Sequence, residues 1–510
     1  MSVEKTIEEV IRGHRGVREA VVVRDESGAL VAFVQSDDQY FRDELGFGAD
    51  EASAVRKWQK AYDLSQRTKE AREATAGFNT VGWISSYTRQ PIPSSEMQEW
   101  VDTTVSDIFR LGPRRVYEIG CGSGLLLLRI APKCDFYAGS DFAPAVLDRL
   151  REQLKVLPSI GERVQIDQRA ADDFSGFKED SVDTSVISSV VQYFPSAAYL
   201  TKVLEGVANM VRPGGRVYVG DVRSLPLLPL FASSVELFRA PDAMTVGDLS
   251  DLIGKRMRRE QELLISPAYF HRLSQQIAKI VGVEIRPLRG RAVNEMSGYR
   301  YQAILHIGKY RAGPTEVGFR NWSDESLSTE QIYELLRAHP DTATGIANIP
   351  NSRVERDVLA VEVLSRANRA DPVRDVRQRV AEYLLKGIDP EDLFALGERL
   401  NFQTQLSWSS GRSDGSYHVC FVPNGLGKQG SPTFIRWPGA DASTSVYLTS
   451  APRAEKHRSE LIVQLKEHCT RNLPSEMVPA SFSLVDTIPQ VHHGPDASAL
   501  LAAQRACNWL

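Results

Sequence analysis

Cysteine is scarce in this chain, with only five residues in 510. They are scattered, odd in number and without the paired spacing of a metal site; they are Cys121, Cys134, Cys420, Cys469 and Cys507. We therefore expect neither a disulfide framework nor a metal site. The residues that follow Met1 do not form a signal peptide. This pattern favours a protein kept reduced in the cytoplasm.

Long apolar runs and an excess of one charge are also missing. The longest apolar stretches, such as residues 225–232, are far shorter than the roughly 20 residues that a membrane-spanning helix needs. The 61 lysine and arginine residues nearly balance 65 acidic ones, so no basic surface for nucleic acid or an anionic membrane is indicated. The length of 510 residues favours two to four globular domains.

Glycine, in contrast, is concentrated at one informative place. Gly120, Gly122 and Gly124 follow the strand-like run 116–119, which contains Glu118, and four leucines come next. This order predicts a buried strand, a tight turn in which the backbone comes close to a ligand, and the start of a helix. The spacing differs from the dinucleotide fingerprint, which disfavours a nicotinamide enzyme. It is the form used by S-adenosylmethionine (SAM) methyltransferases.

The surrounding sequence alternates between strand and helix patterns over residues 114–223, which predicts a doubly wound α/β sheet. Further strands of this sheet are expected at 136–141, 164–166, 181–191, 216–220 and 303–307. Outside it we expect strands at 20–23 and 30–34, helices near 328–338 and 372–386, and a helix followed by a strand within 455–485. Weak domain boundaries are expected near 46–50 and 422–443.

Acidic residues follow the first three predicted strands, where doubly wound sheets bind their ligands. We expect Glu118 to hold the ammonium group of SAM, Asp141 to accept its ribose hydroxyls, and Asp172 to accept from the adenine amino group, with Phe174 as an apolar neighbour. Other predicted cofactor contacts are Gly120, Cys121, Gly122, Gly124, Phe142, Ser189, Tyr87 and Thr88. The alternative is that each acid is simply a surface loop residue.

Longer strings of residues point to a particular family. The strings lie at 83–88, 91–93, 96–100, 190–195, 220–225, 294–295, 299–301, 349–353 and 389–393. Together they resemble the methyltransferase domains embedded in nonribosomal peptide synthetases, over roughly residues 55–425. The resemblance implies a Rossmann-like class I SAM methyltransferase.

The two ends of the chain resemble a different unit. Residues 14–23 are similar to the start of the small C-terminal subdomain of a synthetase adenylation domain, and residues 473–480 to its end. The implied organisation is an α+β subdomain split between 1–45 and 441–510, with the methyltransferase inserted at 46–310 and its C-terminal part at 311–440. The large adenylation core is absent, and Pro495 stands where the family has a lysine. We therefore expect no adenylation by this chain, and the split subdomain is either a carrier-docking platform or a folding remnant.

The resemblance also implies a reaction, the N-methylation of an aminoacyl or peptidyl group held as a thioester on the phosphopantetheine of a carrier protein, alongside other synthetase components. For the amine we expect Glu295 and Asn294 as orienting groups, with Tyr301 and Asp221 behind them. Arg223 either organises Asp221 or forms a plain ion pair. The alternative for Glu295 and Asn294 is a cap at the end of a strand.

Substrate contacts are expected from residues after the fourth strand and from an N-terminal lid; they are Gln192, Tyr193 and Trp83. Core packing is an equal alternative for Tyr193, and Trp83 is also expected to pack a helix onto the sheet. Two other functions stay open: methylation of oxygen or carbon on a tethered or free amino acid, and a non-catalytic module that docks a carrier. The intact glycine motif argues against the second.

Overall fold

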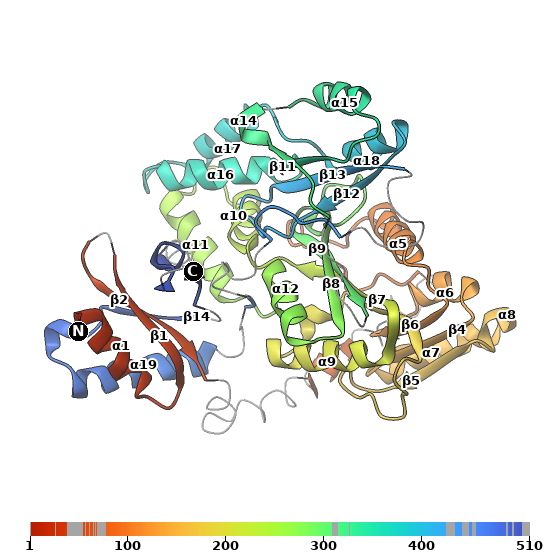
Figure 1. Ribbon diagram of the computed structural model, residues 1–510, viewed down its shortest axis with the longest axis horizontal. Coiled ribbons are helices and arrows are strands. Elements are labelled where there is room, and N and C mark those ends of the chain that lie inside the picture. Colours follow the sequence, from red (N-terminus) through yellow and green to blue (C-terminus); the bar gives the residue numbers. More distant parts are fainter. Residues whose placement is uncertain are drawn as a thin grey trace.

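A computed structural model describes most of the chain (Figure 1). The described residues are 2–37 except 26, 55–56, 58–60, 62–64, 66, 68, 78–308, 315–424 except 326, 434–440, 448–450, and 455–501 except 486–487 and 492–493. Three sheets of three or more strands organise this part of the chain. None of its helices is long and apolar enough to cross a membrane.

The largest sheet has seven strands in the order β5-β4-β3-β6-β7-β9-β8. Its strands are β3 (Arg115–Ile119), β4 (Phe136–Asp141), β5 (Val164–Gln168), β6 (Val182–Ser188), β7 (Val211–Arg223), β8 (Ile280–Pro287) and β9 (Arg300–Ile307). Strands β3 to β7 are mutually parallel, whereas β9 pairs antiparallel with both of its neighbours. The strand order reverses between β3 and β6, which places the ligand crevice of a doubly wound sheet at their carboxyl ends.

Helices cover both faces of this sheet because its strands are apolar on both sides. One core contains Leu200 and Leu204 of α9, and the other contains Leu147 of α7 and Ile108 of α5. The helices of this region are α5 (Ser94–Phe109), α6 (Leu127–Ile130), η1 (Ala131–Lys133), α7 (Pro144–Lys155), α8 (Pro158–Gly161), η2 (Val191–Tyr193), α9 (Ala197–Met210), α10 (Leu228–Arg239), α11 (Val246–Arg258), α12 (Pro267–Gln276) and α13 (Glu295–Tyr299). The predicted doubly wound α/β fold is therefore confirmed.

Two strands differ from the sequence prediction. β7 begins at Val211 rather than near 216, since Val182 pairs with Val211 and Thr184 with Arg216; the register shift between these pairs is a bulge within the strand. β8 was not predicted, because Glu284 and Arg286 interrupt its apolar pattern. It is an edge strand, paired only with β9.

A second sheet of four strands, ordered β10-β11-β13-β12, lies beyond the β8–β9 end of the first (Figure 1). Its elements are β10 (Phe319–Asn321), α14 (Trp322–Glu325), α15 (Thr329–Ala338), β11 (Thr344–Ile349), α16 (Glu355–Arg366), α17 (Val373–Ala381), α18 (Pro390–Arg399), β12 (Phe402–Ser407) and β13 (Tyr417–Pro423). Buried Arg353 donates to the carbonyl oxygens of Leu288 and Gly290, at 2.8 and 2.6 Å, and so ties this region to the segment that follows β8 of the seven-stranded sheet. The two predicted helices are present as α15 and α17, whereas the strands were missed.

The two ends of the chain fold together. β14 (Ser481–Val485) adds parallel to β2 (Leu30–Ser36), which pairs antiparallel with β1 (Val17–Arg24). Helices α1 (Val3–Arg12) and α19 (Glu455–Asn472) pack on this sheet, in a unit that lies apart from the seven-stranded sheet in Figure 1. η4 (Ser475–Met477), β15 (Gln490–Val491) and β16 (Gly494–Pro495) complete the described elements. Kinship with an adenylation subdomain stays a prediction, and the expected boundary at 46–50 lies outside the described residues.

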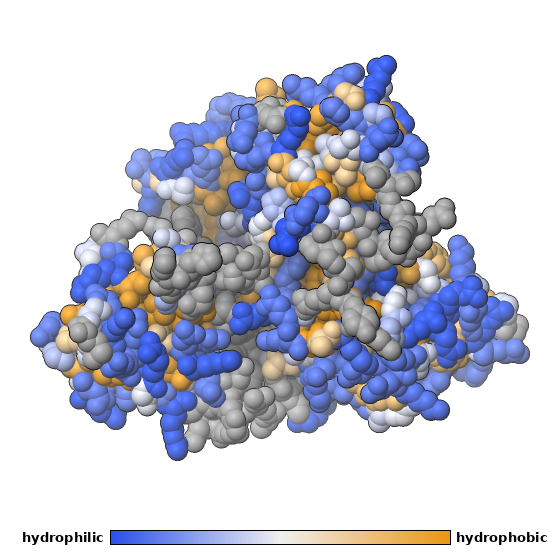
Figure 2. Space-filling view, in the orientation of Figure 1, coloured by the Kyte–Doolittle hydropathy of each residue, from blue (hydrophilic) through white to orange (hydrophobic). Residues whose placement is uncertain are grey.

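The outer surface is mainly polar. In Figure 2 hydrophilic residues dominate the right-hand edge, where β5, α7 and α8 lie. This distribution follows from the amphipathic pattern of α7, whose Val146, Leu147 and Leu150 are buried while its charged residues face outward.

Candidate active site

The glycine turn connects β3 to α6, and hydrogen bonds to the end of β4 fix its position. The N–H groups of Gly120 and Cys121 both donate to the carbonyl oxygen of Ser140, at 2.7 and 3.0 Å. Gly120 has φ of 72°, and a Cβ at that position would approach Val190 to 2.4 Å. Both the backbone conformation and the close approach therefore require glycine.

This turn borders a cavity of about 790 Å³, within the size range of small-molecule sites. Its wall comes from the glycine turn, the ends of β4 and β6, residues 82–86, the segment 256–264 and the region of α13. Predicted site residues on the wall are Trp83, Glu118, Gly120, Cys121, Gly122, Asp141, Phe142, Ser189, Gln192, Tyr193, Arg223 and Glu295. The cavity therefore lies at the crevice that the strand order predicts.

Two buried carboxyl groups stand at the inner end of the cavity. Burial raises the pKa of Glu118 to about 7, the hydroxyl of Tyr137 donates to it at 2.8 Å, and the nearby Asp141 raises the pKa further. Burial likewise raises the pKa of Asp141 to about 6, although its carboxylate accepts from the N–H groups of Gly122 and Ala143 at 3.0 and 2.9 Å. Both groups are ionised above neutral pH and have few donors, so they favour a ligand that supplies positive charge or hydroxyl groups.

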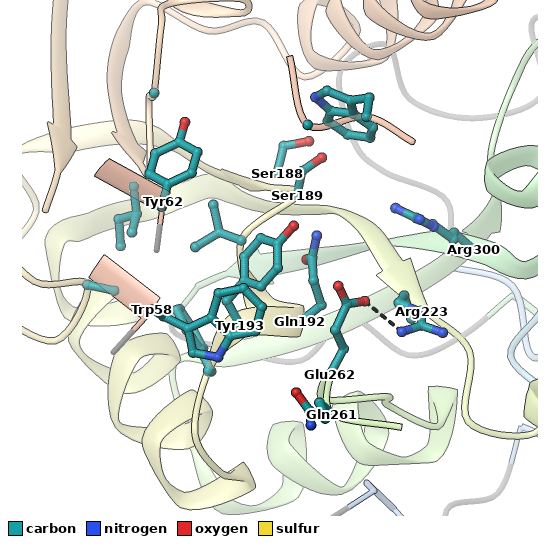
Figure 3. Close-up of a pocket in the computed structure, with 18 of the residues that line it drawn as sticks. Trp58, Tyr62, Ser188, Ser189, Gln192, Tyr193, Arg223, Gln261, Glu262 and Arg300 are labelled. Carbon is teal, nitrogen blue, oxygen red and sulfur yellow. Dashed lines mark hydrogen bonds and ion pairs between the residues drawn. The ribbon is translucent and has the colours of Figure 1, made fainter. Parts of the chain in front are cut away.

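The hydrogen-bond acceptors on the cavity wall fit SAM. Gln192 Oε1 and Ser188 Oγ are buried in this wall and have no hydrogen-bond partner among the described residues. A ligand with an ammonium group, two ribose hydroxyls and an adenine offers donors for Glu118, Asp141 and these orphaned atoms. In Figure 3 Ser188, Ser189 and Gln192 surround the same space, and the ring of Tyr193 lies beside Trp58, with centroids 4.7 Å apart.

Five predicted cofactor residues lie away from the cavity wall, and three of them follow β3 and β5. Asp172 accepts from Tyr199 Oη at 2.9 Å and from Lys202 Nζ at 2.6 Å, so its carboxylate is bound to α9. The ring of Phe174 packs against Gly206 of α9, where a Cβ would approach the ring to 2.2 Å. Gly124 lies behind the turn, where a Cβ would approach Leu150 to 2.7 Å.

The predicted lid contributes less than expected. Trp83 lines the cavity and also packs on Trp100 of α5, with ring centroids 4.9 Å apart. Its side chain is therefore positioned both to contact a ligand and to pack α5. Tyr87 is absent from the wall; its hydroxyl lies 3.1 Å from Ser234 Oγ. Thr88 is exposed, and its hydroxyl accepts from the N–H of Gln90.

Glu295 and Arg223 are the two predicted catalytic residues on the cavity wall, and Glu295 is the carboxylate of the pair. It stands in the first turn of α13, and Ser86 holds both of its oxygens, the N–H at 2.6 Å and the Oγ at 3.0 Å. Asn294 does not orient it. The Asn294 side chain instead accepts from the N–H groups of Met296 and Ser297 and caps α13, so the cap is of a helix rather than a strand.

Asp221 and Arg300 form a buried ion pair beside Glu295. Arg300 Nη1 lies 2.7 Å from Asp221 Oδ2, and its Nη2 lies 3.7 Å from Glu295 Oε1. Burial raises the pKa of Asp221, and Arg300 counteracts this effect. Asp221 has φ of 60° and Ser189 has φ of 58°, and the Ser189 hydroxyl donates to Asp221 at 2.9 Å. Left-handed conformations at residues other than glycine cost energy and concentrate at functional sites.

Two other expectations are corrected by these contacts. Arg223 does not organise Asp221; it pairs with Glu260 at 2.7 Å and Glu262 at 2.6 Å, the second of which is drawn in Figure 3. Tyr301 is buried away from the cavity, and its hydroxyl donates to the carbonyl oxygen of Ile265 at 2.9 Å. Arg223 lines the cavity itself and also fixes the segment 260–262 that borders it, whereas Tyr301 is not on the wall.

Arg300, Trp58 and Tyr62 are among the cavity residues that were not predicted from the sequence. Arg300 lies between the noted Tyr299 and Tyr301, yet a sequence does not tell a buried arginine from one on the surface. Trp58 and Tyr62 belong to a charged segment whose helical pattern gave no sign of facing a ligand. A group of metal-ligating side chains was not found among the described residues.

Comparisons with known proteins agree with this geometry. A family model described as a methyltransferase domain matches residues 117–217, which run from β3 into β7. The chain is 32% identical over 498 residues to chondramide synthase cmdD of Chondromyces crocatus, covering 96% of this chain and 13% of that protein. It is 30% identical over 521 residues to the nonribosomal peptide synthetase agiA of Aspergillus flavus, covering 96% of this chain and 6% of that protein.

The chain thus spans at most about an eighth of these two relatives, since it covers 13% and 6% of their lengths. Among solved structures it is similar to magnesium protoporphyrin IX methyltransferase of Synechocystis, with 13% identity, a TM-score of 0.30, and coverage of 49% of this chain and 96% of that one. The fold assignment rests on the strand order and on the family match. This chain therefore has the class I fold of SAM-dependent methyltransferases, contains a segment that matches a methyltransferase domain, and is similar over nearly its whole length to segments of nonribosomal peptide synthetases.

Proposed function

We propose that this methyltransferase acts on the backbone amine of an aminoacyl or peptidyl group that is held as a thioester on the phosphopantetheine of a carrier protein. The observation that carries the proposal is the position of Glu295. Its carboxylate is held by Ser86 and faces the cavity that the glycine turn borders. The synthetase relatives supply the context of a tethered substrate.

SAM, when bound, supplies an electrophilic methyl group. The residues of this chain bind and orient the cofactor: Glu118 receives the ammonium group and Asp141 the ribose hydroxyls, and the glycine turn lets the backbone come close to the methionyl end. Since methyl transfer is an in-line displacement, alignment of the acceptor provides most of the rate enhancement.

The acceptor amine must be neutral when it reacts. A free α-amino group has a pKa of about 8, so only one proton needs to be accepted from it. Glu295 accepts that proton or the amine N–H, because each carboxylate oxygen keeps a lone pair beyond its bond to Ser86. Arg300 fixes the direction of Glu295 and offers N–H groups to the acceptor carbonyl.

Mass spectrometry tests the proposal directly. Loaded aminoacyl carrier proteins would be incubated with the chain and SAM, and the released product fragmented. A gain of one methylene mass on the backbone nitrogen is the expected result. The same gain on a side chain would instead establish oxygen or carbon methylation, and SAM binding without transfer to any thioester would contradict a tethered acceptor.

SAM binding should weaken on acidification. Because burial raises the pKa of Asp141 to about 6 and of Glu118 to about 7, both groups take up protons as the pH falls from 7.5 to 5.5 and lose their attraction for the ligand. The dissociation constant should rise roughly tenfold for each pH unit below a pKa, for each group that must be ionised. Titration calorimetry across this range would measure it.

Unfolding does not explain such a loss. A carboxyl group whose folded-state pKa is raised binds more protons in the folded than in the unfolded chain, so these two groups add stability as the pH falls towards 4. A dissociation constant that stays constant between pH 7.5 and 5.5 would contradict the roles of Asp141 and Glu118.

Arg300→Lys should lower turnover while SAM affinity is kept. Lysine retains the positive charge that the buried Asp221 needs, but a single ammonium group does not reach Asp221 and Glu295 together. We expect kcat to fall about tenfold, the equivalent of one charge-assisted hydrogen bond. Equal turnover of variant and wild type would show that Arg300 only stabilises the fold.

A further inference from the structure

A group of arginine side chains stands where the cavity meets solvent. Arg256 and Arg259, at the C-terminal end of α11, both line the cavity, and Arg259 is exposed. Arg259 has no side-chain hydrogen bond or ion pair recorded within the described part of the chain, whereas Arg256 pairs with Glu236 at 2.8 Å. We call Arg256 and Arg259, together with Arg239 and Arg89, the mouth cluster; Arg239 and Arg89 are not on the cavity wall, and Arg239 lies within reach of the charges of Arg89 and Arg256.

The mouth cluster gathers positive charge from three separate segments. Arg239 ends α10, and its Nε donates to the carbonyl oxygen of Tyr87 at 3.2 Å. Burial lowers the pKa of Arg239, and the neighbouring charges of Arg89 and Arg256 lower it further. The dipole of α11 favours cations in its own last turn, but it does not account for arginines brought in by α10 and by the turn 85–90.

The acidic residues nearby are already engaged. Glu260 and Glu262 share Arg223, Glu236 pairs with Arg256, and Glu295 is held by Ser86. The whole chain carries a net charge of −4, so the local excess of positive charge does not follow from composition. The cavity is thus cationic at its opening and carries the Glu295 carboxylate within.

We propose that the mouth cluster binds the phosphodiester group of a phosphopantetheine arm, with Arg259 as the main contact. The inference rests on the proposed function, since such an arm carries an anionic phosphate at one end and the reacting amine at the other. An amine at Glu295 leaves the phosphate near the opening. Guanidinium groups bind phosphate through paired, charge-assisted hydrogen bonds, which suits arginine better than lysine.

Binding of the arm itself tests the inference without turnover. Phosphopantetheine and pantetheine would be titrated calorimetrically into the SAM-saturated protein at low salt. We expect phosphopantetheine to bind about tenfold or more tightly than pantetheine, as one or two charge-assisted contacts allow. Arg259→Gln should remove this preference and leave the affinity for pantetheine unchanged, and Arg259→Lys should restore part of it.

A matched control is Arg114→Gln, which removes an exposed charge next to the start of β3. This is the end of the strand opposite to the glycine turn and the cavity. The variant should keep the full preference for phosphate. Equal affinities of wild type for both arms, or a preference that survives Arg259→Gln, would overturn the inference. Methylation of aminoacyl-pantetheine measured in parallel separates the two proposals: its presence supports the proposed function even if the phosphate preference is missing.

Discussion

Glu295→Gln is expected to abolish methyl transfer while SAM affinity is kept. The amide has the shape of the carboxylate and still accepts from Ser86, so α13 and the cavity wall should remain intact. It does not accept a proton from the acceptor amine. Loss of a general base typically lowers the rate by about 100-fold to 10,000-fold, and we expect kcat to fall within that range. Single-turnover transfer to a loaded carrier, followed by mass spectrometry, would measure it.

The matched control is Asn294→Ser, at the neighbouring position. Serine also caps a helix, and Asn294 serves α13 rather than the cavity, so activity should stay within about twofold of wild type, apart from a small change in stability. If Glu295→Gln were active and Asn294→Ser inactive, the assignment of roles in α13 would be reversed. Full activity of the Glu295→Gln variant at neutral pH would contradict a general base at this position. Catalysis would then come only from alignment of the acceptor amine with the methyl group.

Asp141→Asn is expected to reduce SAM affinity by about 100-fold or more, because two hydrogen bonds from ribose hydroxyls to a charged acceptor would be weakened or lost. The variant should still fold. Burial raises the pKa of Asp141, which means that its charge is unfavourable in the folded chain, and asparagine removes that charge. Calorimetric titration with SAM gives the affinity, and a thermal melt without ligand gives the stability.

Asp172→Asn is the informative comparison. The sequence analysis assigned both aspartates to the cofactor, but the structure binds Asp172 to Tyr199 and Lys202. We expect its substitution to change SAM affinity by less than about twofold, the size of effect typical of an exposed ion pair. A loss of affinity as large as that of Asp141→Asn would mean that the segment after β5 moves to the cavity when ligand binds.

The sequence by itself determined the class of the fold and the cofactor end of the site. The alternating strand and helix patterns of 114–223 and the spacing of Gly120, Gly122 and Gly124 are local features, since strand burial and turn conformation depend on neighbouring residues. Glu118 and Asp141 lie together on the cavity wall because each stands towards the carboxyl end of a parallel strand, where such ends meet, and their contacts with the cofactor stay a prediction. The union of the two chain ends in one α+β unit was likewise predicted.

The tertiary structure alone decided the partners of the charged residues at the acceptor end. Arg300 pairs with Asp221 across 79 positions, and Ser86 reaches Glu295 across 209. Contacts of this kind depend on how β7, β9 and α13 pack, and no local pattern encodes which of two nearby arginines meets a given carboxylate. For the same reason the sequence left two roles open for Arg223, and the fold decides for the plain ion pair, which Arg223 forms with Glu260 and Glu262. The sequence therefore determines which residues line the cavity at the glycine turn, and the packing of distant segments determines which charged groups face it near Glu295.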